Sequence, residues 1–373
     1  MASLRVLEVA GTPYEMGYAH GLAYRDDIRA FTESRMALCS DPNWTGRDLN
    51  RDDIVALAEA CLAEHEAYAP ELVEEMRGTA VATGLSLAEL VVVNGFTDFI
   101  DVVYNVDNSG FSRNGTKLVS DNCTAFIVPD KAANGQGFYG QTWDMNADAT
   151  PYVILLRVRP NDLPSALMFT ITGCVGMIGM NDAGIAIGIN NLMGSDGQVG
   201  VTWPFVVRKA LAQTNIEDAL DCILNAKLAG AHNYLLFDKN GRGYNVEAMS
   251  TAYHLTELGP EDIESIVHTN HCLYPNTLSV SRPRPGDSQM TSENRLSDGY
   301  KHLSNLPVTP ESLMEMTRDT NAICVAPKPP MFVESCGAAI MRPATGDLWA
   351  VWGQPAYNEY EHFTVAPELA MAD

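Results

Sequence analysis

The stretch Asp121–Val128, DNCTAFIV, places a cysteine at the head of an apolar, β-branched run directly after a polar loop. A second short run, Gly140–Asp144, GQTWD, ends on a carboxylate, and the segment Asp130–Gly137 between the two runs is rich in hairpin-forming residues. Antiparallel pairing of the two runs would bring Cys123 and Asp144 to the same open end of a hairpin. We therefore take these two residues as the centre of a candidate site.

Composition limits the class of protein. A chain of 373 residues with 46% hydrophobic residues can bury a large core, as one unit or two. Lys and Arg total 24 against 47 Asp and Glu, and the resulting charge of −23 repels phosphate backbones and anionic lipid surfaces. We expect neither nucleic acid nor a membrane as a partner. Residues 1–10 lack the apolar core of a signal peptide, so we expect a cytoplasmic protein.

The eight cysteines are spread along the chain without a CxxC pair, which argues against zinc ribbons and a disulfide framework. A lone cysteine is usually a small buried hydrophobe, and we accept that interpretation for all of them except Cys123. His268 and His271 flank Asn270, but this spacing in a strand puts the two rings on opposite faces. We interpret both histidines as structural and expect no metal and no cofactor.

The first hundred residues are predicted to be mostly helical. A strand over 4–9 precedes a helix that begins with the capping box at Thr12 and Glu15 and runs to about Leu38. Gly17 and Gly21 on its face indicate close packing against a neighbour. Further helices are expected over 52–68 and 70–84, and a short one after Ser86.

After Cys123 the pattern changes to strands, which are followed by two helices, more strands and a final hairpin over 333–341 and 348–352. The segment 275–295 is rich in Pro, Ser and Arg and is predicted to be a surface loop, with helical stretches near 294–303 and 310–318. Strands, two helices and strands again predict two sheets packed between helices.

Several motifs in the same order resemble the acyl-coenzyme A:6-aminopenicillanic acid acyltransferase family, whose members are N-terminal-nucleophile hydrolases. They are Gly11–Gly17 (GTPYEMG) with His20-Gly21, Cys123-Thr124, Trp143-Asp144, and Val267–Leu273 (VHTNHCL). The resemblance implies an α+β fold of the four-layer αββα type. It also implies a precursor that cuts itself between Asn122 and Cys123, leaving chains 1–122 and 123–373 associated as one structural unit. A homo-oligomer remains a further alternative.

The same resemblance assigns catalytic roles. Cys123 would be the nucleophile, and its new α-amino group, with an intrinsic pKa of about 8, would accept the thiol proton. Asn270 would donate its side-chain amide to the oxyanion, and Asp144 would orient the α-amino group. Thr124, Trp143 and Arg342 are candidates for the substrate pocket.

Two departures from the family pattern stand out. The residue before the nucleophile is Asn122, where the family commonly has glycine, so we expect slower processing. Ile323-Cys324 is followed by Val325, where the family has an arginine. Arg342 is the candidate that would replace it.

Three functions are carried forward. The first is hydrolysis of a small linear N-acyl amine through a Cys123 acyl-enzyme. The second is acyl transfer to an amine from acyl-coenzyme A or an amide. The third is a non-catalytic scaffold, which the intact set of Cys123, Asp144 and Asn270 argues against. The absence of a phosphate-binding glycine loop and the acidic charge favour the hydrolase.

Overall fold

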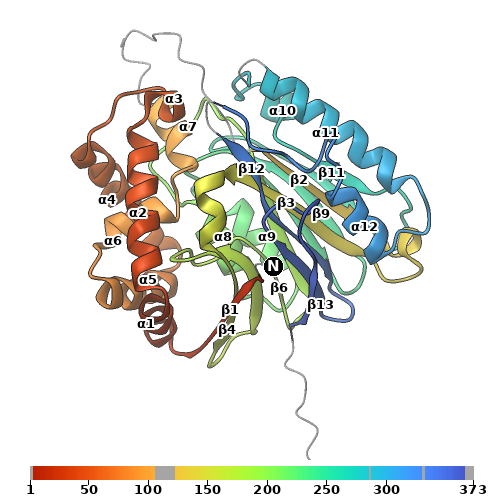
Figure 1. Ribbon diagram of the computed structural model, residues 1–373, viewed down its shortest axis with the longest axis horizontal. Helices are drawn as coiled ribbons and strands as arrows, with labels where there is room; N and C mark the ends of the chain where they lie inside the picture. Colours follow the sequence, from red (N-terminus) through yellow and green to blue (C-terminus); the bar gives the residue numbers. More distant parts are fainter. Residues whose placement is uncertain (1–2, 106–121, 285–286, 330–331, 366–373) are drawn as a thin grey trace, which may run out of the picture.

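The structure, a computed structural model, describes residues 3–105, 122–284, 287–329 and 332–365. Two β-sheets form its centre (Figure 1). The larger sheet contains, in spatial order, β1 (Arg5–Gly11), β4 (Val153–Pro160), β5 (Ala166–Ile171), β6 (Ile178–Asn181), β7 (Ile185–Asn191), β8 (His232–Asp238), β9 (Gly243–Ala248) and β10 (Tyr253–Leu258). The smaller sheet contains β11 (Ile266–His268), β2 (Asn122–Val128), β3 (Phe138–Asn146), β12 (Val333–Arg342), β13 (Asp347–Trp352) and β14 (Glu361–Thr364).

Helices flank the sheets and fill one end of the molecule. The N-terminal group is α1 (Pro13–Ala23), α2 (Arg25–Ser40), α3 (Pro42–Thr45), α4 (Arg51–Tyr68), α5 (Pro70–Thr83), α6 (Leu87–Val93) and α7 (Asp98–Asn105). The others are α8 (Trp203–Ala210), α9 (Ile216–Leu224), α10 (Pro275–Leu278), α11 (Asp287–Leu303) and α12 (Pro310–Thr317), with short 3₁₀ turns η1 (Asp130–Ala133) and η2 (Ala147–Tyr152).

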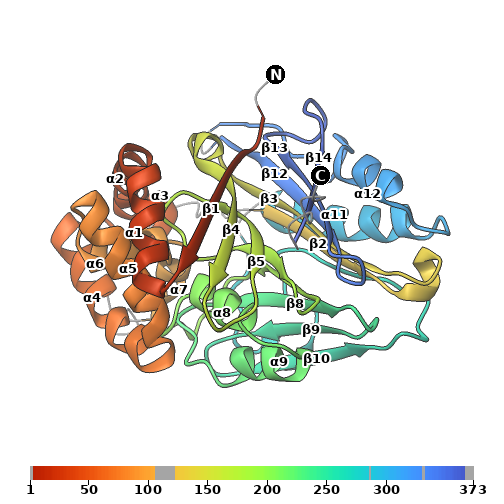
Figure 2. The ribbon, with the colours of Figure 1, turned by 90° about the horizontal axis from the view of Figure 1, so that it is seen from below.

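The layers follow the predicted αββα order. In Figure 2, α11 and α12 lie against the smaller sheet, while α8 and α9 lie on the far side of the larger sheet. The helices α1–α6 gather beside this sandwich rather than within it. The sheets contact each other through β2 and β3 on one side and β7 and β8 on the other. The fold-class prediction is confirmed.

Alternation along β2 explains how this strand is buried on both faces. Cys123, Ala125 and Ile127 belong to the large core, whereas Phe126 and Val128 belong to a second core that also contains Leu313 and Met316 of α12. A strand between two apolar layers must be apolar on both faces, as its sequence is.

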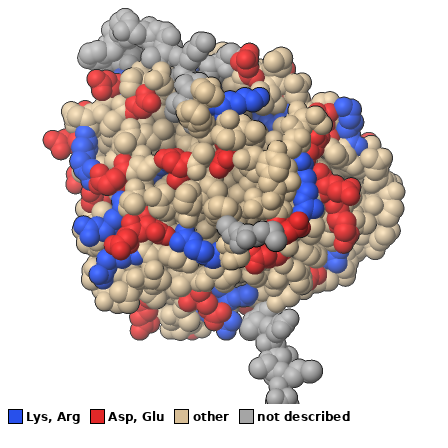
Figure 3. All heavy atoms as spheres, in the orientation of Figure 1, with Lys and Arg blue, Asp and Glu red and all other residues tan. Residues whose placement is uncertain are grey.

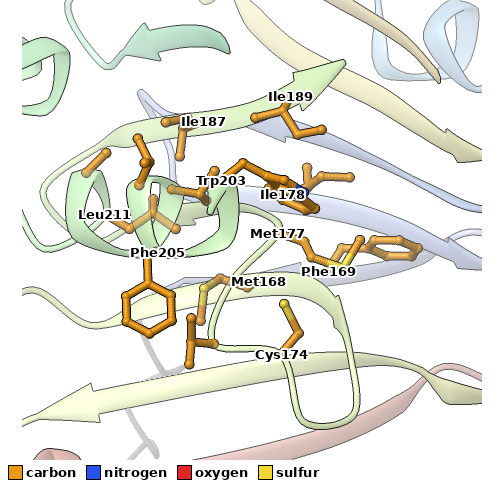
Figure 4. Close-up of a cluster of buried hydrophobic side chains, with 14 of the residues drawn as sticks. Met168, Phe169, Cys174, Met177, Ile178, Ile187, Ile189, Trp203, Phe205 and Leu211 are labelled. Atoms are coloured by element: carbon orange, nitrogen blue, oxygen red, sulfur yellow. The ribbon is translucent and has the colours of Figure 1, made fainter. Parts of the chain in front are cut away.

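The large core continues between the larger sheet and α8. Figure 4 shows Met168 of β5 and Ile187 of β7 gathered with Phe205 of α8 and with Leu211, which follows this helix. These side chains are almost completely excluded from water. This packing fixes β7, whose C-terminal end reaches the candidate site.

The first hundred residues are tied into the sandwich by β1, which pairs in parallel with β4. Gly17 of α1 faces α5 so closely that an added Cβ would lie 1.7 Å from the carbonyl oxygen of Glu75. The predicted close packing is confirmed. The single helix expected from Pro13 to about Leu38 is wrong, because the backbone leaves the helical conformation at Tyr24 and separates α1 from α2.

A second expectation also needs correction. The segment 275–295 is not a loop throughout, because α10 occupies its start and α11 begins at Asp287. Composition hid this helix, since its polar residues cover an exposed face. Within the described part of the chain, no single helix is long and apolar enough to cross a membrane, and α5 and α6, which reach that limit only as a pair, meet at 108°. Acidic and basic side chains are interspersed over the face shown in Figure 3.

Candidate active site

The β2–β3 hairpin brings the two central residues of the candidate site together. Asn122 pairs with Asp144, and Cys123 pairs with Trp143, in an antiparallel register. The connection uses η1 and the left-handed residue Asn134, as the turn-rich sequence predicts. Cys123, the second residue of β2, is completely buried. All eight cysteines lie in the described part of the chain, and each is a buried thiol.

Asn270 reaches this corner from the loop after β11, the strand that pairs with β2. Its Oδ1 accepts a hydrogen bond of 2.8 Å from the main-chain nitrogen of Cys123, and its Nδ2 donates one of 3.0 Å to the carbonyl oxygen of Asn191. The partners therefore fix which end of the carboxamide faces Cys123. The predicted oxyanion role would use the second hydrogen on Nδ2, because the first is engaged with Asn191.

Arg295 on α11 is the residue that sequence reasoning missed. Its guanidinium is completely buried and donates to the carbonyl oxygen of Cys123, to Thr124 Oγ1 at 3.2 Å, to Asn122 Oδ1 at 3.1 Å and to Asn270 Oδ1 at 2.9 Å. One cation thus contacts both sides of the peptide bond between Asn122 and Cys123. The available signal was helical spacing, since Ser292, Arg295 and Gly299 lie on the buried face of α11.

Asp144 is also completely buried. Its Oδ1 accepts a hydrogen bond of 2.6 Å from Ser335 Oγ, and this hydroxyl in turn accepts one of 2.9 Å from the Val325 nitrogen. Val325, where the resemblance leads us to expect an arginine, therefore lies one hydrogen-bonded side chain from Asp144. Its apolar side chain brings no charge to that carboxyl group.

Of the three predicted pocket residues, Thr124 directly follows Cys123 in β2. Its nitrogen donates to Thr142 Oγ1 at 3.2 Å, and its hydroxyl accepts from Arg295. Trp143 is buried in the large core and borders a void of about 10 Å³ that Phe96, Met177 and Trp203 also line. Such a void has room for about one water molecule, so Trp143 acts as an apolar wall.

The structure places Arg342, the third predicted pocket residue, away from Cys123. It ends β12 at the opposite end of the strand from Ser335, stacks over Phe138 and Trp349, and lies 3.9 Å from Asp347. The register of β12 against β3 separates Arg342 from Cys123, because Ser335 pairs with Asp144 whereas Met341 pairs with Tyr139. Arg342 therefore lies away from Val325 and Cys123, whereas Arg295 contacts both Asn122 and Cys123.

The histidines around Asn270 have structural partners. His268 Nε2 lies 2.9 Å from Glu247 Oε1. Burial raises the pKa of Glu247, but hydrogen bonds from His268 and from Thr277 outweigh it and leave the pKa below its usual value. Burial, with neighbouring cations, lowers the pKa of His271 to about 4, so this ring is neutral at pH 7. Among the described residues, no group of three or more His, Cys, Asp or Glu side chains could hold a metal ion.

Two hollows adjoin the site from different sides. One, of about 450 Å³, is lined by Asn122, by Cys324 and Val325, and by residues at the start of α11. The other, of about 340 Å³, is lined by Asn270 together with Arg282 and Arg284. Asn122 and Asn270, which both adjoin Cys123, thus line two different hollows.

Comparisons with known proteins identify the family of the chain. The family model for acyl-coenzyme A:6-aminopenicillanic acid acyl-transferase matches residues 131–357. An acyl-coenzyme A:6-aminopenicillanic-acid-acyltransferase 40 kDa form from Emericella nidulans is 26% identical over 325 residues, covering 85% of this chain and 84% of its own. An uncharacterized protein from Archaeoglobus fulgidus is 24% identical over 259 residues, covering 64% of this chain and 42% of its own.

Distant similarities to solved structures accompany these matches. A mutant of conjugated bile acid hydrolase from Clostridium perfringens has a TM-score of 0.42 at 9% identity, covering 65% of this chain and 96% of its own. Penicillin V acylase from Agrobacterium tumefaciens has a TM-score of 0.39 at 10% identity, covering 65% of this chain and 86% of its own. The family model alone spans more than half of the sequence. The chain belongs to the acyl-coenzyme A:6-aminopenicillanic acid acyl-transferase family.

Proposed function

We propose that the chain is a self-cleaving amidohydrolase that uses Cys123 as its N-terminal nucleophile and acts on small linear N-acyl amines. The observation that carries the proposal is the contact set around the Asn122–Cys123 bond. Arg295 donates hydrogen bonds to residues on both sides of this bond, and Asn270 Oδ1 accepts a hydrogen bond from the nitrogen that cleavage would release. Burying an arginine and a carboxamide beside one peptide bond costs free energy of folding. The presence of both groups there supports a role in cleaving that bond.

Cleavage begins with attack of Cys123 Sγ on the carbonyl carbon of Asn122. The peptide C–N bond breaks as the C–S bond forms, and the nitrogen takes the thiol proton. Water then hydrolyses this thioester, leaving a carboxyl group on Asn122 and an α-amino group on Cys123. Arg295, already 3.1 Å from Asn122 Oδ1, is close enough to balance the new carboxylate.

Turnover repeats the same attack on an external amide. The α-amino group takes the Sγ proton, the thiolate attacks the substrate carbonyl, and the leaving amine departs with that proton. Water hydrolyses the acyl-enzyme to the carboxylic acid. Asn270 Oδ1 holds the α-amino group in place, the remaining Nδ2 hydrogen is the oxyanion donor, and Asp144 borders the new chain start through its pairing with Asn122.

Denaturing mass spectrometry of the purified protein tests the first step. The wild-type chain should give two fragments that meet at Asn122 and Cys123, whereas Cys123→Ala should give one. Cys336→Ala is the matched control, because Cys336 is an equally buried thiol elsewhere in the sheet, and it should still yield two fragments. An active wild-type enzyme that remains a single chain would refute the proposal.

Acyl transfer is the second candidate, and the similarity to the Emericella nidulans acyltransferase is the observation that favours it. A thioester donor gives the same acyl-enzyme, which an amine can intercept instead of water. Amine release from N-acyl amines is measured against amide formation from acyl-coenzyme A plus free amines. Efficient amide formation with little hydrolysis of any amide would reverse the order of the two candidates.

A further inference from the structure

The hollow beside Asn270 differs in charge from the rest of the protein. Its volume is about 340 Å³. Besides Asn270, it is lined by His271, Cys272, Ser281, Gln289, a few apolar side chains, and two arginines, Arg282 and Arg284. None of its described lining residues is acidic, in a chain whose net charge is −23.

Both arginines are held in place by the fold rather than extending into solvent. Each is 6% exposed. Arg284 donates to the carbonyl oxygen of Asn270 at 2.8 Å and to Ser288 Oγ at 3.3 Å. Arg282 is anchored through its main-chain nitrogen to Met193 and through Nη2 to Asp101 at 2.6 Å. Fixed guanidinium groups lose little side-chain entropy when they bind a ligand.

Arg282 has capacity left for a ligand. Only its Nη2 has a hydrogen-bond partner among the described residues, since Nε and Nη1 are buried without one. Its guanidinium also stacks 4.0 Å from the centre of the Tyr104 ring, which leaves the edge of the group for hydrogen bonding. Buried donors without partners are unfavourable, so a protein retains them where something else supplies the acceptor.

The position of the hollow relates it to the reaction. Asn270 forms part of its wall, and the Oδ1 atom of the same residue contacts the Cys123 nitrogen. Asn270 is therefore the residue that joins the hollow to Cys123, and a reactant that occupies both would extend past its side chain. His271 is neutral at pH 7, so the charge met by that extension comes from the arginines.

We propose that this hollow, with Arg282 and Arg284, is a subsite for an anionic oxygen group carried by the reactant bound at Cys123. The inference rests on the proposed function and adds a substrate class to it. The group is a carboxylate or a phosphate, since both match the planar donors of a guanidinium. A carboxylate would come from an N-acyl amino acid, and a phosphate from the donor acyl-coenzyme A.

Matched substrates distinguish the two sources. The first pair is an N-acyl amino acid and its carboxamide, which differ only in the charge beyond the scissile bond. The second pair is an acyl-coenzyme A and the acyl-pantetheine that lacks the phosphates. For one of the pairs, the wild-type enzyme should favour the anionic member by roughly 10-fold to 100-fold in kcat/KM, mainly through KM.

Arg284→Met should abolish this preference, measured as the ratio of kcat/KM within a pair, because a loss of activity through the lost contact with the Asn270 carbonyl oxygen would affect both members alike. Arg284→Lys should restore part of the preference. Arg318→Met removes the same charge from a half-buried arginine that ion-pairs with Glu359 on another surface, and it should keep the preference. Arg282→Met is the weaker variant because it leaves Asp101 buried without its cation. Fragment masses and thermal unfolding show whether each variant is folded.

Equal kcat/KM within both pairs, or a preference that survives Arg284→Met in a folded protein, would overturn the subsite. If no substrate is turned over, acetate and inorganic phosphate serve as probes in calorimetric titrations of the full protein. The wild type should bind one of them at least 10-fold more tightly than Arg284→Met does. Failure of wild-type binding would refute the subsite, whereas binding without turnover would refute the proposed activity and leave the subsite standing.

Discussion

The Cys123 nitrogen and Asn270 Oδ1 lie 2.8 Å apart, and the same oxygen accepts a hydrogen bond of 2.9 Å from Arg295. A single atom therefore joins the first strand of the hairpin, the loop after β11 and the helix α11. None of these three elements can move without disturbing the other two.

Replacing Asn270 separates its two roles. Asn270→Ala should keep the fold and lower kcat by about 10²-fold or more, because both the acceptor and the oxyanion donor are lost. Asn270→Asp retains an acceptor for the Cys123 nitrogen but has no N–H. Its kcat should therefore fall as far as that of Asn270→Ala if the donor role dominates. Steady-state kinetics on one good substrate decides, and full activity in Asn270→Ala would exclude both roles.

Arg295→Met should slow cleavage and change the pH profile of whatever mature enzyme forms. A cation that shares an acceptor with the Cys123 nitrogen disfavours protonation of the α-amino group, so its removal should move the acid limb of kcat/KM upward by about one pH unit. The acid limb of Arg295→Lys should lie between those of the wild type and Arg295→Met. Lys301→Met, on the exposed side of the same helix, should keep the wild-type limb. A limb that does not move in cleaved Arg295→Met would contradict this electrostatic role.

Asp144→Ala should impair processing. Asp144 faces Asn122 across the hairpin and is fixed by Ser335, so its loss removes a buried charge beside the scissile bond and leaves a cavity. The fraction of uncut chain after a fixed time of expression is the measure. Asp182→Ala, in an exposed turn, should be processed as the wild type is, and equal processing of both variants would remove Asp144 from the cleavage step.

Acid should destabilise the protein through its buried histidines, of which His20 and His65 are two. Burial lowers the pKa of His20 and of His65 to about 4, and the Nε2 atom of each accepts a main-chain N–H, from Gly173 and Thr202 respectively. The folded pKa lies below the unfolded value of about 6.5, so the unfolded state binds more protons and stability is lost as the pH falls from 6.5 towards 4.

The expected loss between pH 7 and pH 5 is on the order of 2 kcal/mol for each histidine. Urea unfolding at several pH values measures it. His65→Gln should flatten the dependence, whereas His254→Gln, on the partly exposed strand β10, should not. An unfolding free energy that stays constant over this range would show that neither ring is neutral in the fold for the reason given.

Gly17→Ala should destabilise the protein by roughly 3 kcal/mol, because the added methyl group meets the carbonyl of Glu75 at the closest contact between α1 and α5. Gly259→Ala is the control, since its Cβ would meet only Asp262 Oδ2 at 3.7 Å. Thermal or urea unfolding compares the two. Similar stability of both variants would mean that α1 and α5 separate at little cost.

Local rules predicted most elements and the hairpin that carries the site. Capping boxes located α1 and α6, and two short runs joined by a turn-rich segment located the pair Cys123 and Asp144. Periodicity failed at Tyr24, because the break between α1 and α2 depends on tertiary packing. The same limit explains Arg295, whose significance comes from four contacts with residues 25 to 173 positions away.

The strand β1 gains a different meaning if the chain is cut before Cys123. It contributes an edge of the larger sheet by pairing with β4, so the fold assembles while both strands belong to one molecule. After the cut, an unfolded molecule must recapture a separate chain to rebuild that edge, and its refolding becomes concentration-dependent and competes with aggregation of the exposed sheet. Unfolding of the mature enzyme would then be practically irreversible at low concentration, and its lifetime would be governed by the unfolding rate.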